Sequence, residues 1–170
     1  TAHHTKLEHQ LGVLYVLQKA QKAGRLPKDH QQAFEIAASA YHMGHLPLTY
    51  ATERAVLLAA RENPEIREAL VKKVLTLDSL LDDWSLPCGA HSCRGFEGKP
   101  SDLLQSAIDR NDWKHLYRFI SAWKLFSKRE AQALCSQNEQ LTEVLHILLN
   151  RRCRFFRMFH EYDRLDYVLR

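Results

Sequence analysis

Most of this chain consists of segments in which apolar residues recur every three or four positions, separated by short turn-forming stretches. In the first such segment, residues 5–23, this spacing is followed by Leu7, Leu11, Leu14 and Leu17. Residues spaced in this way share one face of a helix, whereas a strand would need alternating apolar and polar residues. The periodicity therefore predicts amphipathic helices, with this leucine stripe on the inner face of the first one.

The composition supports the same conclusion. Leu and Ala contribute 43 residues, whereas the β-branched Val, Ile and Thr together contribute 18. Leu and Ala favour helices, and β-branched residues favour strands. With 6 Gly and 5 Pro, the chain has too few turn residues for a β-sandwich or barrel. We predict an all-α fold of about eight helices in antiparallel hairpins, forming a helical bundle or a short α-solenoid.

Several helix starts are marked by residues that cap helices. Asn63 precedes Pro64, which suits the first helical position because proline has no N–H to leave unpaired. Asp29, Thr49 and Ser101 are expected to cap three other helices. Side chains expected to be largely buried are those of Leu70, Leu77, Leu116, Ile120, Trp123 and Leu145.

The helix boundaries near the end of the chain are less sharply marked. Ser127 and Glu130 form a capping-box pattern, which predicts a helix from about residue 128. A further helix is expected from Glu139, either continuing past Asn150 or breaking there. Tyr162–Leu169 is predicted as a short terminal helix.

One long interruption divides the helical pattern. Residues 85–100 hold three of the six glycines and two of the five prolines, and at this length the segment is a linker or a functional loop. We therefore predict N-terminal helical hairpins over residues 1–84, a loop over 85–100 and C-terminal hairpins over 101–170, together forming one continuous domain.

The loop contains a small group of possible metal ligands, Cys88, His91 and Cys93. Thiolate and imidazole both bind zinc, and His42 or His45 would be candidates for a fourth ligand. The spacing matches no strong zinc signature, so a loop with unmodified thiols is the alternative, and no cofactor is expected. A cysteine nucleophile in the same loop would need a neighbouring base.

Two other polar groups stand at predicted helix ends. His42 and His45 lie at a helix C-terminus, where protonated imidazoles interact favourably with the helix dipole. Asp78, Asp82 and Asp83 lie at the end of another helix. Paired carboxylates can act as acid and base or bind a cation, but solvated surface acids are the simpler interpretation.

A run of cations and aromatic residues near the C-terminus is the predicted binding site. Between residues 150 and 160 the chain carries four arginines and no acid. A helix would place these cations on one side and phenylalanines on the other. The alternative is that the arginines pair with Glu161, Asp163 and Asp166. The residues predicted to contact a partner are Arg151, Arg152, Arg154, Arg157 and His160.

These patterns favour a non-enzymatic protein-interaction module, an adaptor, chaperone or regulatory domain that binds an acidic partner through this basic helical face. The formal net charge of +4 is compatible with that partner, and an RNA- or DNA-binding domain using the same face is the alternative. A metalloprotein or enzyme built on the Cys88–Cys93 loop is a weaker alternative. No phosphate-binding glycine loop, nucleophile elbow or His-Glu-x-x-His motif occurs in the sequence.

Hydropathy and cysteine usage give an expected location. The longest uncharged stretch, residues 36–52, contains Gly44 and Pro47, so no membrane span is predicted. Four cysteines in a chain of this size suggest the cytoplasm or another reducing compartment. The sequence begins at Thr1 rather than Met, and targeting signals could lie outside it.

Overall fold

The computed structural model describes residues 5–81, 84–85, 94–127 and 138–169. Over these residues the protein is all-α, as predicted, and contains no strand. The elements are α1 (Lys6–Lys22), the 3-10 helix η1 (Lys28–His30), α2 (Gln31–Ala40), α3 (Tyr50–Glu62), α4 (Pro64–Asp78), α5 (Pro100–Asp109), the 3-10 helix η2 (Trp113–His115), α6 (Leu116–Phe126), α8 (Asn138–Leu149) and α9 (Arg154–Leu169).

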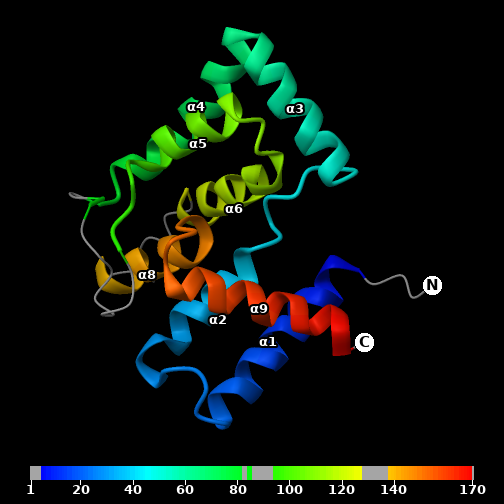
Figure 1. Ribbon diagram of the computed structural model, residues 1–170, viewed down its shortest axis with the longest axis vertical. Helices are drawn as coiled ribbons and strands as arrows, with labels where there is room; N and C mark the ends of the chain where they lie inside the picture. The colour runs from blue at the N-terminus through cyan, green and yellow to red at the C-terminus, as the bar shows by residue number, and fades with distance from the viewer. Residues whose placement is uncertain (1–4, 82–83, 86–93, 128–137, 170) are drawn as a thin grey trace.

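The helices form a bundle in which partners distant in sequence lie side by side (Figure 1). Helix α1 packs against α9, α2 against α8, and α4 against α5, while α6 contacts α2, α4 and α8. The two ends of the chain lie close together because α1 and α9 run next to each other (Figure 1). One buried cluster receives side chains from helices on both sides of the segment 85–100.

The predicted apolar stripe of α1 is confirmed only in its second half. Leu17 is buried and Leu14 packs against the core, whereas Leu7 is 63% exposed and Leu11 is 55% exposed. At the start of the helix, His9 and Val13 are buried in place of these two leucines. His9 faces inward, where Asp163 and Asp166 of α9 supply its polar partners.

The other core predictions are partly confirmed. Leu77, Leu116 and Leu145 are at most 1% exposed. Leu70, Ile120 and Trp123 are half-buried and pack against the edge of the core.

The cap predicted at Asn63 is confirmed, because its side-chain oxygen accepts hydrogen bonds from the backbone N–H groups of Glu65 and Ile66. The cap predicted at Ser101 is wrong, since α5 already begins at Pro100. The N–H and the hydroxyl of Ser101 instead donate to the carboxylate of Asp78, at 3.1 and 2.5 Å. Asp78 thus joins the end of α4 to the start of α5.

The C-terminal part is more continuous than predicted. Helix α8 ends at Leu149, and α9 is a single helix over Arg154–Leu169 that includes the segment predicted as a separate helix. Cys153, directly before α9, is buried and disulfide-bonded, which the cysteine count did not predict. The helix predicted after Ser127 falls in residues 128–137, outside the described residues.

Trp84 and Phe96, which lie on either side of residues 86–93, pack against each other. The N–H of Phe96 donates to the carbonyl of Trp84 at 2.9 Å, and the two rings meet edge to face. Both side chains are buried.

Cys88, His91 and Cys93 lie outside the described residues, as do Asp82 and Asp83. Within the part of the chain that is described, no helix combines the length and apolarity needed to cross a bilayer.

A buried histidine in α8 makes the fold sensitive to acid. His146 is fully buried, and its Nδ1 accepts a hydrogen bond from the side-chain amide of Asn150 at 2.8 Å. The same amide also donates to the carbonyl of Arg94 at 2.9 Å. The imidazole therefore carries its proton on Nε2, which has no hydrogen-bond partner among the described residues.

Burial lowers the pKa of His146 from 6.5 to about 4. The unfolded chain binds a proton below pH 6.5 that the folded chain does not, so stability is lost as the pH falls from 6.5 to 4 and is unaffected above that range. We expect a loss of about 3 kcal/mol between pH 7 and pH 4. Urea unfolding at both pH values should show that the loss of stability between pH 7 and pH 4 is smaller for His146→Gln than for the wild type by about 3 kcal/mol. Equal losses in the two proteins would contradict a buried, neutral His146.

Candidate metal centre

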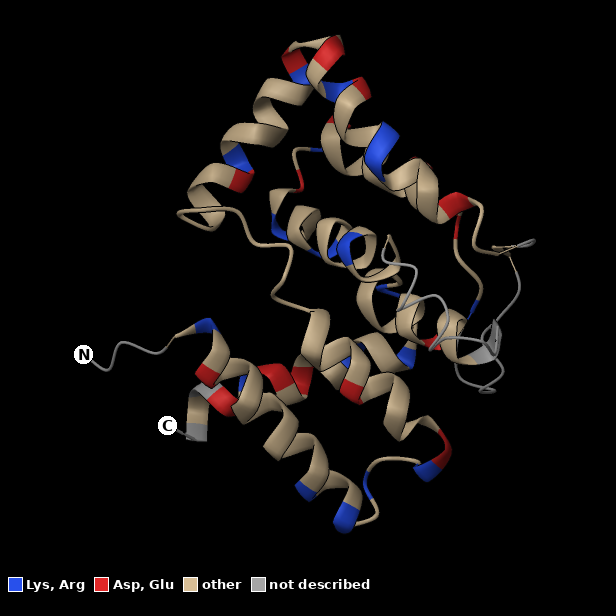
Figure 2. Ribbon diagram, turned by 180° about the vertical axis from the view of Figure 1, so that it is seen from behind, with Lys and Arg blue, Asp and Glu red and all other residues tan. Residues whose placement is uncertain are grey.

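The site begins with a buried histidine of α1 held between two carboxylates of α9. His9 Nε2 lies 2.9 Å from Asp163 Oδ1, and His9 Nδ1 lies 2.7 Å from Asp166 Oδ2. All three side chains are less than a tenth exposed. Asp163 and Asp166 are three residues apart, so one face of α9 presents both to α1. Figure 2 shows acidic segments of α9 beside the start of α1.

A second imidazole, from the end of α2, completes the group. His42 Nε2 lies 3.4 Å from Asp163 Oδ1, the same oxygen that faces His9. The rings of His9 and His42 have centroids 4.8 Å apart. His42 Nε2 is buried and makes no hydrogen bond among the described residues. Two imidazole nitrogens and one carboxylate oxygen therefore converge on one small buried volume.

This geometry fits a divalent metal ion. The ligand atoms of His9, His42 and Asp163 all lie within 4.8 Å of one another, and the ligand atoms of a tetrahedral zinc ion are about 3.3 Å apart. The second nitrogen of His9 is bonded to Asp166, as the non-coordinating nitrogen of a metal-binding histidine usually is to a carboxylate. Asp166 would orient the ligand, and a solvent molecule would complete the coordination.

The electrostatics of the cluster also favour a cation. Burial by itself would raise the pKa of Asp163, but His42 and His9 beside it hold that pKa well below its usual range. Burial by itself would lower the pKa of His9, but its bonds to Asp163 and Asp166 raise it. The carboxylate of Asp163 thus stays ionised and attracts positive charge to the position between the rings, which a metal ion would supply in place of a proton.

A buried histidine–glutamate pair lies next to the cluster. The ring of His45 stacks on that of His42 at 5.2 Å, and its Nδ1 lies 2.6 Å from Glu53 Oε1. Glu53 is fully buried, and its Oε2 has no hydrogen-bond partner among the described residues. Burial lowers the pKa of His45, an effect that Glu53 opposes. A neutral imidazole backed by a carboxylate can accept or release a proton.

The backbone between α2 and α3, which carries His45, is tightly constrained. Gly44 donates its N–H to Ser121 Oγ at 2.8 Å, which fixes the end of α2 on α6. Leu48 and Thr49 have φ of 60° and 47°, a conformation that residues with side chains rarely adopt. Strained residues of this kind occur preferentially at functional sites.

Two tyrosines and an arginine lie beside His42 and His45. The Tyr117 hydroxyl donates to the Tyr41 hydroxyl at 2.7 Å, and Arg118 donates to both oxygens. Tyr41 meets His42 edge to face at 4.7 Å. Burial raises the pKa of Tyr41 and that of Tyr117, so both phenols remain neutral. Arg118 is thus a buried cation hydrogen-bonded to neutral groups.

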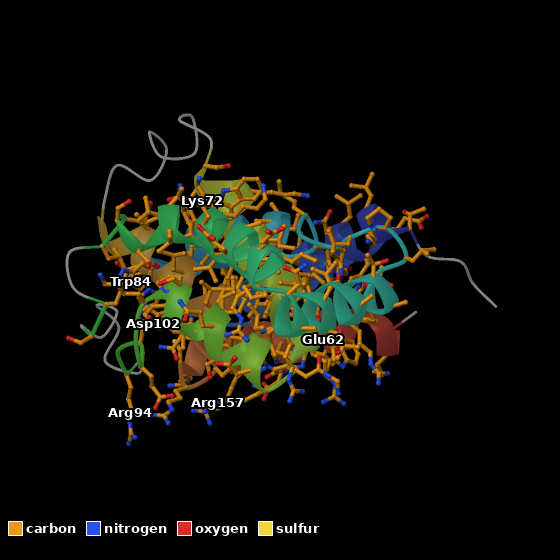
Figure 3. The ribbon with its side chains drawn as sticks, turned by 90° about the horizontal axis from the view of Figure 1, so that it is seen from above. Glu62, Lys72, Trp84, Arg94, Asp102 and Arg157 are labelled. Carbon is orange, nitrogen blue, oxygen red and sulfur yellow. The ribbon has the colours of Figure 1, made fainter. Side chains whose placement is uncertain are left out.

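The predicted binding residues near the C-terminus do not form one uniform row. Arg151 pairs with Asp112 and Arg152 with Glu97, each at 2.5 Å. Arg154, Arg157 and His160 are exposed, and Arg157 points away from the helices (Figure 3). Asp163 and Asp166, considered as partners for the arginines, face the histidines instead.

Neither His9 nor Asp163 was predicted as a site residue, whereas His42 was predicted as a possible fourth zinc ligand for the loop 85–100 and as a cation at a helix end. One signal was present: His9 lies in register with Val13 and Leu17, on the stripe that the structure buries. A buried histidine needs a polar partner. No protein-family model matches the chain, and neither the curated proteins nor the solved structures contain a significant match to it.

Proposed function

We propose that the protein is a metal-dependent hydrolase whose metal ion is bound by His9, His42 and Asp163. The proposal is carried by one observation, the convergence of these three ligand atoms in a buried site. Catalytic zinc sites commonly use three protein ligands and keep one position for water. Bound metal would lower the pKa of that water, which supplies a hydroxide nucleophile near neutral pH.

The surroundings of the cluster support hydrolysis. His45 and Glu53 form a buried pair beside His42 that can exchange protons with a reacting group. The cluster also lies close to the surface, because the half-exposed His160 is 3.8 Å from Asp163 Oδ2.

The test compares metal-stripped protein with protein reloaded with Zn²⁺, Mn²⁺ or Co²⁺, using hydrolysis of p-nitrophenyl acetate and p-nitrophenyl phosphate as readouts. We expect turnover of at least one ester only after reloading. Glu53→Gln should retain the metal and lose about a hundredfold in rate, the scale of general acid–base catalysis. Reloaded wild type that is no faster than His42→Ala would contradict the proposal.

Binding of an acidic partner is a second candidate function. It is favoured by the exposure of Arg154 and Arg157, which have no ion-pair partner among the described residues. Arginine binds carboxylates and phosphates through paired hydrogen bonds. The double substitution Arg154→Glu and Arg157→Glu should abolish capture of an acidic peptide or of RNA without changing the melting temperature. Unaltered capture of both ligands would reject this function.

A further inference from the structure

A cavity of about 480 Å³ lies where α5, α6 and the end of α8 meet. This volume is within the range of small-molecule sites. One wall is apolar and includes Phe96, Leu103, Phe119 and Leu149. The ligand residues of the metal centre do not line it.

The inner part of the cavity holds an unusual charge. Arg118 lines the cavity although it is only 4% exposed. Its hydrogen bonds go to the neutral hydroxyls of Tyr41 and Tyr117, and its guanidinium lies 4.3 Å from the Phe156 ring centroid. Among the described residues no carboxylate forms an ion pair with it, and Asp163, whose charge acts on it from farther away, faces His9 and His42. A buried cation is costly unless an anion compensates it.

The other charged residues of the cavity leave its positive charge in excess. The carboxylate of Glu97 is paired with Arg152 and that of Asp112 with Arg151. The third acid, Asp102, accepts a hydrogen bond from the backbone N–H of Lys99. Arg110 also lines the cavity and forms no ion pair with the described residues.

We propose that this cavity binds a small organic anion, with a carboxylate or phosphate group held by Arg118 and Arg110 and an apolar body against the opposite wall. Guanidinium groups recognise both oxyanions through paired hydrogen bonds. The cavity is larger than a single oxyanion needs, and the phenylalanine and leucine side chains would bury the remainder of the ligand.

Isothermal titration calorimetry on the metal-stripped protein tests ligand binding in this cavity without a metal ion in the metal centre. The probes are phenyl phosphate, benzoate, phenol and inorganic phosphate. We expect one saturable site for phenyl phosphate or benzoate, and weaker binding of phenol and of inorganic phosphate. The first two probes distinguish a phosphate site from a carboxylate site. The proposal would be overturned if neither phenyl phosphate nor benzoate saturated a site, or if phenol bound as tightly as these anions.

Matched variants locate the binding. Arg110→Gln should weaken binding of the ring-bearing anion at least about tenfold, the scale of one charge-assisted contact. Arg157→Gln removes an exposed arginine outside the cavity and should change the affinity less than twofold. An Arg110→Gln protein that binds as tightly as Arg157→Gln would refute the assignment.

Discussion

Replacing Gly44 by alanine should destabilise the protein by about 3 kcal/mol or more, the upper range for overpacked sites. A Cβ atom at this position would lie 1.8 Å from the carbonyl oxygen of Tyr117 and 2.5 Å from the backbone nitrogen of Ser121. Both atoms belong to the backbone of α6 and cannot move aside as a side chain can. The loss should appear in urea unfolding followed by circular dichroism.

Gly24→Ala is the matched control. Gly24 has a φ of +68°, but a Cβ atom there would meet no atom within 4 Å. The substitution carries only the cost of an unfavourable backbone conformation, about 1–2 kcal/mol. A Gly44→Ala protein as stable as Gly24→Ala would show that α2 and α6 do not approach as closely as described.

Replacing His42 by alanine should lower the affinity for a divalent transition metal by more than about a hundredfold, since loss of an orienting partner already costs 10–100-fold. Asp166→Asn should produce that smaller loss, because it removes the carboxylate bonded to His9 and leaves the three ligands in place. Titration of stripped protein with Zn²⁺ against a chromogenic chelator gives both constants.

His115→Ala is the control for these titrations. His115 is a partly exposed histidine of η2 and belongs to no cluster of metal ligands among the described residues. Its removal should leave the affinity unchanged. Equal weakening of zinc binding by His115→Ala and His42→Ala would contradict the proposed centre, because zinc would then bind to histidines throughout the protein.

The fold class was predictable because it depends on local properties. Leucine and alanine favour helices at every position, and the hydrogen bonds of the Asn63 cap involve residues two and three positions away. The inner face at the start of α1 was not predictable, since Leu7 and Leu11 compete there with His9 and Val13. The choice between them depends on Asp163 and Asp166, more than 150 residues away.

The acids of α9 also explain why its continuity was missed. The sequence from Glu161 to Asp166 is polar and resembles a helix end on the surface, yet Asp163 and Asp166 are buried against α1. Buried charges are rare unless they are paired, so a hydropathy pattern places them outside. The ion-pair partners of two arginines were missed for a related reason: Glu97 and Asp112, which pair with Arg152 and Arg151, are distant from them in the sequence.

The most direct test of the metal centre is the metal content of the native protein. Wild-type protein and Asp163→Asn are each incubated with Zn²⁺, Mn²⁺, Fe²⁺ or Co²⁺, dialysed, and measured by elemental mass spectrometry. The account predicts one ion per chain in the wild type for at least one metal, and only background in Asp163→Asn, which lacks the charged oxygen shared by both imidazoles. Background metal in the wild type with every ion, or equal retention by Asp163→Asn, would show that His9, His42 and Asp163 form a proton-linked network and not a metal centre.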